Sequence, residues 1–122
     1  MSSVLYVEDN EYNRKIVRQL LSRTSHRLRE AADGEAALDM VREERPDLIL
    51  MDVQLPKMSG LDVTRALRAD PVTADVPIIV VTSFALSGDD QRAMAAGASA
   101  YIAKPYSPRE LMALIQKFLA EP

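Results

Sequence analysis

The chain has 122 residues, 48% of them hydrophobic and 27% charged, which is the composition of one soluble globular domain and not of a disordered segment. Fifteen Lys and Arg residues against 18 Asp and Glu residues give a net charge of -3, which disfavours binding to a nucleic-acid backbone. Because the chain has no cysteine, a disulfide scaffold, a thiolate metal site and a cysteine nucleophile are all excluded.

Neither a membrane span nor a secretory signal is predicted. The longest apolar runs, such as residues 48–51, are far shorter than the roughly 20 residues that a spanning helix needs. The start of the chain has no basic segment, and Glu8 and Asp9 come before any long apolar stretch. We therefore expect a cytoplasmic protein with no membrane and no nucleic-acid partner.

Short apolar runs alternate five times with longer segments of helical period, a pattern typical of a parallel sheet covered by helices. The predicted strands are residues 4–7, a weaker 27–31, 48–51, 78–81 and 100–103. The third and fourth are continuously apolar, as expected for strands that are buried on both faces. They should form the centre of the sheet.

A helix is predicted after each strand. The apolar faces of the first three are Ile16, Val17, Leu20 and Leu21, then Ala37, Leu38 and Val41, then Leu61, Ala66 and Leu67. The fourth should begin near Ser87 and end at Gly97, a residue that readily adopts a left-handed stop. The fifth has Ser107 as its cap, Pro108 at its first position and Glu110 to complete a capping box.

This succession predicts an α/β fold, a doubly wound five-stranded parallel (βα)₅ sheet in the order 2-1-3-4-5. The whole chain, residues 1–122, is expected to be one domain with no effector domain attached. In such a fold, ligands bind outside the carboxyl ends of the strands. The residues at those ends should therefore decide function.

Polar residues stand at the carboxyl end of four predicted strands. They are Glu8 and Asp9 after the first, Asp52 after the third, Thr82 and Ser83 after the fourth, and Lys104 and Pro105 after the fifth. Three carboxylates at one rim repel one another unless a cation is present, and Mg²⁺ suits oxygen ligands of this kind. Zinc has no ligand set, since His26 is the one histidine. A carboxylate beside Mg²⁺, a hydroxyl and a lysine can attack phosphorus, which makes Asp52 the candidate nucleophile.

Each of these residues has a simpler explanation when taken alone. The Glu8–Asp9 pair could cap a helix or form a turn, Thr82 could be an ordinary strand-end residue, and Lys104 a surface charge. Asp52 is harder to explain in this way, because it follows an apolar strand and burying a carboxylate is costly without a partner. The functional interpretation depends on their joint placement at the strand ends.

Several segments together resemble one family. They are VLYVEDN at residues 4–10, DLILMD at 47–52, PKMSG at 56–60, VTS at 81–83 and Lys104–Pro105. The chain is similar to response-regulator receiver domains, the CheY-like family, over essentially its whole length. Asn10, Asn13 and Ser59 make it look most like stand-alone DivK-type regulators and the receivers of hybrid kinases.

The resemblance implies a phosphoacceptor and a metal site. Asp52 would accept a phosphoryl group from a histidine kinase or a histidine phosphotransfer protein. Asp9, Asp52 and the backbone carbonyl of Gln54 would coordinate Mg²⁺, while Glu8 would act through water. The response would be a changed surface that binds a downstream protein, so the chain would be a two-component signalling switch and not an enzyme.

The resemblance also assigns roles to four further residues. Thr82 would bind a phosphoryl oxygen and Lys104 would form an ion pair with it. Pro105 would follow a cis peptide bond. Tyr101 would be an aromatic switch whose rotamer is coupled to Thr82. Beside the pocket, Gln54 and Phe84 hold positions that set how long the phosphoryl group persists, and Ser83 stands where the family often has alanine.

Two other functions compete with this one. A Mg²⁺-dependent phosphatase that forms an aspartyl phosphate would need an acidic residue two positions after its nucleophile, but residue 54 is Gln. A flavodoxin-like flavin carrier would need a Ser/Thr/Gly-rich phosphate loop after the first strand, where Glu8 and Asp9 would repel phosphate.

Two features have no clear place in this function. Residues 14–29 contain six basic residues and no acidic one, so they form either a docking stripe for an acidic partner or a solvated face, and we favour the solvated face. His26 lies near the second strand, away from the strand ends, and is expected at the surface.

Overall fold

The computed structural model describes residues 2–82 and 88–119. Its elements are β1 (Ser3–Val7), α1 (Glu11–Leu21), β2 (Arg27–Ala31), α2 (Gly34–Glu43), β3 (Leu48–Asp52), α3 (Gly60–Ala69), β4 (Ile78–Thr82), α4 (Asp89–Ala96), β5 (Ala100–Ala103) and α5 (Pro108–Phe118). The strands form one parallel sheet in the order β2-β1-β3-β4-β5. The predicted (βα)₅ fold and strand order are confirmed.

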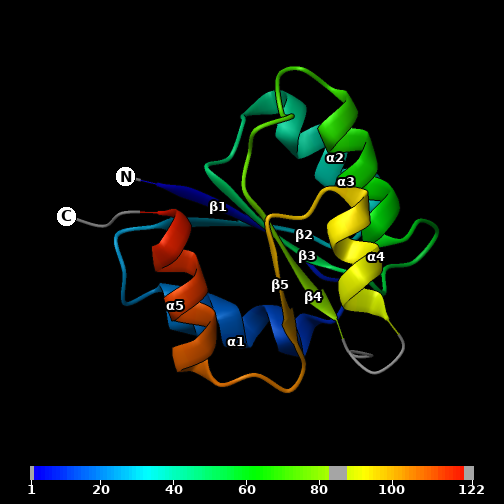
Figure 1. The fold of residues 1–122 in the computed structure, drawn as a ribbon. Helices are drawn as coiled ribbons and strands as arrows, with labels where there is room; N and C mark the ends of the chain where they lie inside the picture. The colour runs from blue at the N-terminus through cyan, green and yellow to red at the C-terminus, as the bar shows by residue number, and fades with distance from the viewer. Residues whose placement is uncertain (1, 83–87, 120–122) are drawn as a thin grey trace.

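The sheet separates two apolar cores. Helices α1 and α5 cover one face, and α2, α3 and α4 cover the other (Figure 1). Successive strand residues point to opposite faces, so in β1 Leu5 and Val7 join the core under α2 and α3, while Val4 and Tyr6 join the core under α1 and α5. The three inner strands, β1, β3 and β4, are buried along their full length, which explains their continuous apolar sequence.

The predicted helix faces are right in part. Val17 and Leu21 are buried in α1, but Ile16 is 41% exposed. In α3, Ala66 is exposed, and the residues that join Leu61 and Leu67 on the buried face are Val63 and Thr64. The prediction was wrong at Ile16 and Ala66 because a helix turns about 100° per residue, so a side chain beside the buried stripe can face solvent.

Helix ends follow the predicted capping chemistry. The Ser107 hydroxyl accepts a hydrogen bond from the Glu110 N–H (3.1 Å), and Gly97 ends α4 in the left-handed region at φ 111°. Helix α4 begins at Asp89, with Gly88 as the residue before its first turn. The predicted start at Ser87, together with Ser83 and Phe84, lies outside the described residues.

Glycine at position 60 lets the first turn of α3 lie against the end of β3. A Cβ atom on Gly60 would lie 1.9 Å from the backbone oxygen of Asp52, so any larger residue would push helix and strand apart. The Gly60 N–H donates to the carbonyl of Val53 (3.0 Å), and Thr64 donates to the carbonyl of Gly60 (2.8 Å). The backbone that follows Asp52 is therefore fixed by the helix packed on it.

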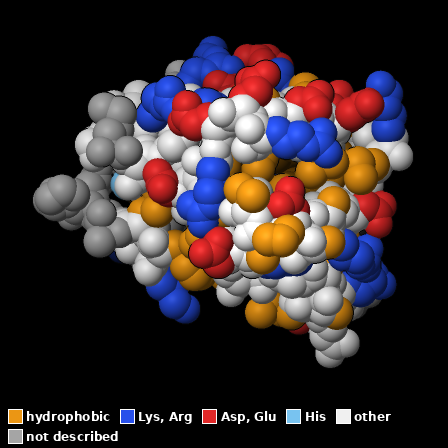
Figure 2. Space-filling view, turned by 90° about the horizontal axis from the view of Figure 1, so that it is seen from above, with side chains coloured by type: hydrophobic (Ala, Val, Ile, Leu, Met, Phe, Trp, Pro, Cys, Tyr) orange, Lys and Arg blue, Asp and Glu red, His pale blue; other side chains and the backbone are white. Residues whose placement is uncertain are grey.

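The basic segment at residues 14–29 is largely paired within the chain. Arg14 and Arg18 bind Glu11 and Glu30, Arg27 binds Glu44, and Arg29 donates to the carbonyls of Met40 and Glu44. This pairing supports a solvated, internally paired surface over a docking stripe. Figure 2 draws the opposite side of the molecule from α1, and there too basic and acidic side chains are interspersed and not gathered by sign.

His26 is buried, with 7% of its surface exposed, so the prediction that it lies at the surface was wrong. It directly precedes β2, where the chain enters the sheet, and the sequence pattern there gave no sign of burial.

Within residues 2–82 and 88–119, no helix is long and apolar enough to cross a membrane.

Candidate functional site

The carboxyl ends of β1, β3, β4 and β5 bring the predicted site residues to one edge of the sheet. Parallel pairing aligns Val7 with Met51, and Asp52 with Val81, so the residues after β1 and β3 meet. Carboxylate oxygens of Glu8, Asp9 and Asp52 all lie within 4.8 Å of one another. The ammonium group of Lys104 lies 3.0 Å from Glu8 Oε1 and 3.4 Å from Asp52 Oδ2.

Glu8 is the most enclosed of these carboxylates, with 1% of its surface exposed. Its Oε1 accepts hydrogen bonds from the Tyr6 hydroxyl (3.2 Å), the Asn13 side-chain amide (3.2 Å) and Lys104 (3.0 Å). Its Oε2 accepts one from the backbone N–H of Asn10 (3.3 Å). Sequence reasoning missed Tyr6 as a site residue, although a tyrosine in an otherwise aliphatic strand signals a buried hydroxyl that needs a partner.

Asp52 is also buried, and its two oxygens have different partners. Oδ1 accepts the backbone N–H of Gln54 (3.2 Å), and Oδ2 faces Lys104 (3.4 Å). Burial, together with the hydrogen bond and the charge of Glu8, raises the pKa of Asp52 to about 7, against the lowering effect of Lys104 and the Gln54 N–H. Near neutral pH, this carboxyl therefore holds a proton much of the time.

The pKa values of the two neighbouring groups, Glu8 and Lys104, both shift in the direction that favours the charged form. Burial acts to raise the pKa of Glu8, but hydrogen bonds from Asp52 and Lys104 outweigh it and hold that pKa below its usual value. Burial acts to lower the pKa of Lys104, but the two carboxylates outweigh it and raise that pKa. Glu8 and Asp52 therefore titrate as a pair beside the lysine, with the pKa of Glu8 lowered and that of Asp52 raised.

The donor set fits a hard divalent cation. Three carboxylates, one exposed (Asp9) and two buried (Glu8 and Asp52), bring oxygen atoms together that can serve as metal ligands. A bound cation would relieve the repulsion between them. Gln54 is held beside them by its N–H bond to Asp52. That its carbonyl coordinates the metal, and that Glu8 acts through water, stay predictions.

The remaining predicted residues flank this cluster. Thr82 is buried at the end of β4, and its carbonyl accepts the Lys104 N–H (2.7 Å). The peptide bond between Lys104 and Pro105 is cis, as the resemblance implied. Tyr101 lies on β5 opposite Val80 and is 40% exposed, with its side chain on the surface beside α5. Its role as a switch coupled to Thr82 stays a prediction.

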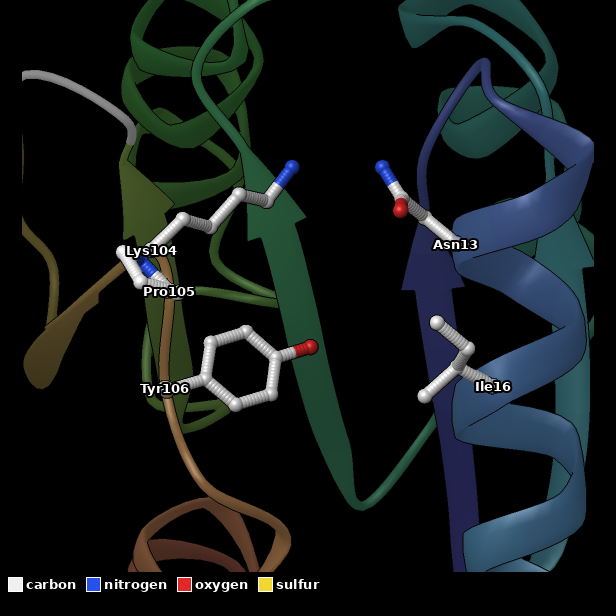
Figure 3. Close-up of a pocket in the computed structure, with 5 residues that line it drawn as sticks. All are labelled: Asn13, Ile16, Lys104, Pro105 and Tyr106. Atoms are coloured by element: carbon white, nitrogen blue, oxygen red, sulfur yellow. The ribbon is translucent and has the colours of Figure 1, made fainter.

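A pocket of about 360 Å³ opens beside the cluster. Asn13 and Ile16 of α1 form one wall, and Lys104, Pro105 and Tyr106 form the other, with the polar ends of Asn13 and Lys104 pointing toward each other (Figure 3). Because Lys104 and Asn13 also bind Glu8, the wall of this pocket is continuous with the carboxylate cluster.

Comparison with known proteins agrees with this geometry. Residues 4–116 match the family described as response regulator receiver domain. The chain belongs to this family. It is 44% identical to the polar-differentiation response regulator DivK of Brucella anthropi over 119 residues, which are 98% of this chain and 97% of that protein.

Solved receiver structures share the fold. The receiver domain of the sensor histidine kinase PA1611 from Pseudomonas aeruginosa, with a magnesium ion coordinated in its active-site cleft, is 37% identical with a TM-score of 0.89 over 96% of both chains. The chemotaxis response regulator CheY4 of Vibrio cholerae is 31% identical with a TM-score of 0.91 over 98% of this chain and 99% of that one. The predicted CheY-like, DivK-like identity of this receiver domain is confirmed.

The raised pKa of Asp52 gives a pH-dependent prediction for metal binding. The folded state holds the Asp52 proton more tightly than the unfolded chain does. The contribution of this proton to the free energy of unfolding is therefore lost as pH rises toward about 7. A cation needs the ionised carboxylate, and Mg²⁺ should therefore stabilise the domain more at about pH 8 than at about pH 5.5. A gain of about 1–2 kcal/mol corresponds to roughly 4–8 °C in melting temperature for a domain of this size.

Thermal unfolding with and without Mg²⁺ at the two pH values measures this effect. Asp9→Ala and Asp52→Asn should each lose most of the Mg²⁺-induced shift, whereas Asp39→Asn, at an exposed position in α2, should keep it. Equal shifts at both pH values in the wild type would contradict the assigned site.

Proposed function

We propose that this receiver domain accepts a phosphoryl group on Asp52 from a histidine kinase or a histidine phosphotransfer protein, and that the modification changes its binding to a downstream protein. The observation that carries this proposal is the buried Asp52 carboxylate between Glu8 and Lys104, at the edge where parallel strands end. A carboxylate that is merely structural would not be expected beside a second buried carboxylate.

The geometry suits phosphoryl transfer. An oxygen of ionised Asp52 forms a bond to phosphorus while the bond from phosphorus to the donor's histidine nitrogen breaks, and that nitrogen keeps the electron pair. Lys104 can turn from the carboxylates to the phosphoryl oxygens, and the Thr82 hydroxyl can donate to one of them. Mg²⁺, when bound, supplies positive charge to the carboxylates and to the transferred group.

The phosphatase alternative lacks its second acidic group. Gln54, two residues after Asp52, is exposed and cannot act as a general acid. The function as a phosphorylated switch is therefore favoured over an enzyme that releases phosphate from a substrate. A cytoplasmic location and the single-domain organisation of residues 1–122 stay predictions from the sequence.

Phosphorylation at a single residue tests the proposal. Acetyl phosphate with Mg²⁺ should add the mass of one phosphoryl group to the wild type, and Asp52→Asn should remain unmodified because it has lost the attacking oxygen. Intact-mass spectrometry at neutral pH measures the product, with Asp39→Asn as the matched control that stays reactive. Labelling of Asp52→Asn at the wild-type level would overturn the assignment.

The donor protein has a candidate contact surface next to Asp52. Ile16 and Pro105 are exposed at the pocket in Figure 3, and Lys104 connects that pocket to Asp52. A donor that brings phosphohistidine to Asp52 must cover the adjoining surface, and exposed apolar side chains there provide burial area. We therefore place the donor contact over α1 and the segment that follows β5.

Substitution of Ile16 separates docking from chemistry. Ile16→Glu should slow transfer from a phosphorylated histidine donor roughly tenfold, a loss of about 1.4 kcal/mol, because it puts a charge in an apolar contact. The rate with acetyl phosphate should be unchanged, since that donor is too small to reach the surface. Val72→Glu is the control, because Val72 is also an exposed apolar residue but precedes the amino end of β4, away from the carboxyl ends where the site lies. Equal rates for Ile16→Glu and the control with the protein donor would contradict the placement.

The output surface is assigned to α4, β5 and α5. A phosphoryl group on Asp52 adds acceptor oxygens that can draw the Thr82 hydroxyl toward them, which makes room for the exposed ring of Tyr101 to turn inward. This movement would alter the surface that a downstream protein binds.

Amide NMR spectra with beryllium fluoride and Mg²⁺ test the output surface. Signals of Tyr101 and of α4, residues 89–96, should shift in the wild type, because their surroundings change with the rotamer. Asp52→Asn should show no such shifts. Changes confined to the residues that contact Asp52 would disprove the coupling while leaving phosphorylation intact.

A further inference from the structure

Tyr6 places a hydroxyl group beneath the functional site. Its side chain is fully buried in the core under α1 and α5, and the hydroxyl donates to Glu8 Oε1 (3.2 Å). Burial, with Tyr106 and Glu8 close by, raises the pKa of Tyr6, so this group keeps its proton and remains a donor. An aliphatic residue would fill the same strand position without supplying that donor.

The same oxygen of Glu8 has two other donors. Asn13 donates from α1 (3.2 Å) and Lys104 from the end of β5 (3.0 Å). Of these three, the Lys104 ammonium is the one that the proposed function would move, because it would turn toward the new phosphoryl oxygens. Its departure would leave the buried Glu8 carboxylate with fewer donors, and an undersatisfied buried charge costs free energy.

We propose that Tyr6 is a positioning residue that, together with Asn13, keeps the buried Glu8 carboxylate satisfied, so that Lys104 can leave it for the phosphoryl group. This inference rests on the proposed function of Asp52. Tyr6 acts through Glu8 and Lys104 and does not contact the reacting atoms. Its position on β1, the strand that Glu8 directly follows, would hold the donor at a fixed place if Lys104 moves.

The proposal separates two binding events. With Mg²⁺ alone, Lys104 still binds Glu8, so loss of the Tyr6 hydroxyl should have little effect. With a phosphoryl mimic, Lys104 would turn toward the mimic, and Glu8 would then depend on its remaining donors, Tyr6, Asn13 and the Asn10 N–H. The hydroxyl should therefore matter much more for the mimic than for the metal.

The variant Tyr6→Phe removes the hydroxyl and keeps the ring that packs in the core. It should weaken beryllium fluoride binding in saturating Mg²⁺ roughly five- to tenfold, the effect of one lost hydrogen bond to a charged group, and weaken Mg²⁺ binding by about twofold or less. NMR titration measures the first affinity and isothermal titration calorimetry the second. Asn13→Ala removes another donor to the same oxygen and should show the same selective loss, which keeps the proposal testable if Tyr6→Phe folds poorly.

The matched control is Thr73→Val, which removes a buried hydroxyl that donates to the Leu67 carbonyl (2.6 Å) at the far end of α3. It should lower the melting temperature and leave both affinities unchanged. Equal losses of Mg²⁺ and beryllium fluoride affinity in Tyr6→Phe, or no loss of either, would overturn the proposal for Tyr6. A wild type that binds no beryllium fluoride and gains no phosphoryl group from acetyl phosphate would overturn the function of Asp52 as well.

Discussion

Two buried carboxylates, Glu8 and Asp52, lie side by side at the edge of the sheet, and one lysine ammonium faces both. Placing like charges together away from water is unfavourable, and a single cation compensates for it in part. Burial and the neighbouring Glu8 still raise the pKa of Asp52 to about 7, so the lysine offsets only part of the cost of ionising this carboxyl group. A fold that tolerates this arrangement must be stabilised elsewhere, and here the two apolar cores on either side of the parallel sheet provide that stability.

The sheet also fixes the geometry of the cluster. The register of the parallel strands β1, β3, β4 and β5 fixes where each strand ends relative to its neighbours. The carboxylates and Lys104 therefore meet at one edge of the sheet without contributions from long loops. The close approach of Gly60 to the Asp52 backbone then anchors the segment after β3. The glycine at position 60 therefore helps to determine where the Asp52 carboxylate lies.

The sequence was sufficient to predict the strand order and the residues that meet at the strand ends, because continuous apolar runs and fixed handedness leave few topologies. It was less informative about side chains. Periodicity placed Ile16 and Ala66 on the buried faces of their helices, but both side chains are exposed in the structure. His26 was expected at the surface but is buried. The donors to Glu8 from Tyr6 and Asn13 depend on rotamers, which no spacing rule specifies. The same is true of the internal pairing of the basic segment, where charge counting alone left two alternatives open.

Lys104 links the stability of the site to its chemistry. It lies 3.0 Å from Glu8 and 3.4 Å from Asp52, so in the unmodified protein its positive charge already faces both buried carboxyl groups. A metal ion or a phosphoryl group at Asp52 would change this balance, since each would alter the charge that faces the lysine. The other donors to Glu8 would limit the cost of the proposed exchange, because they do not depend on the lysine. In the proposed function, this buried pair would make the site responsive to a cation and to phosphorylation, and the hydrogen bonds around Glu8 would keep that response local.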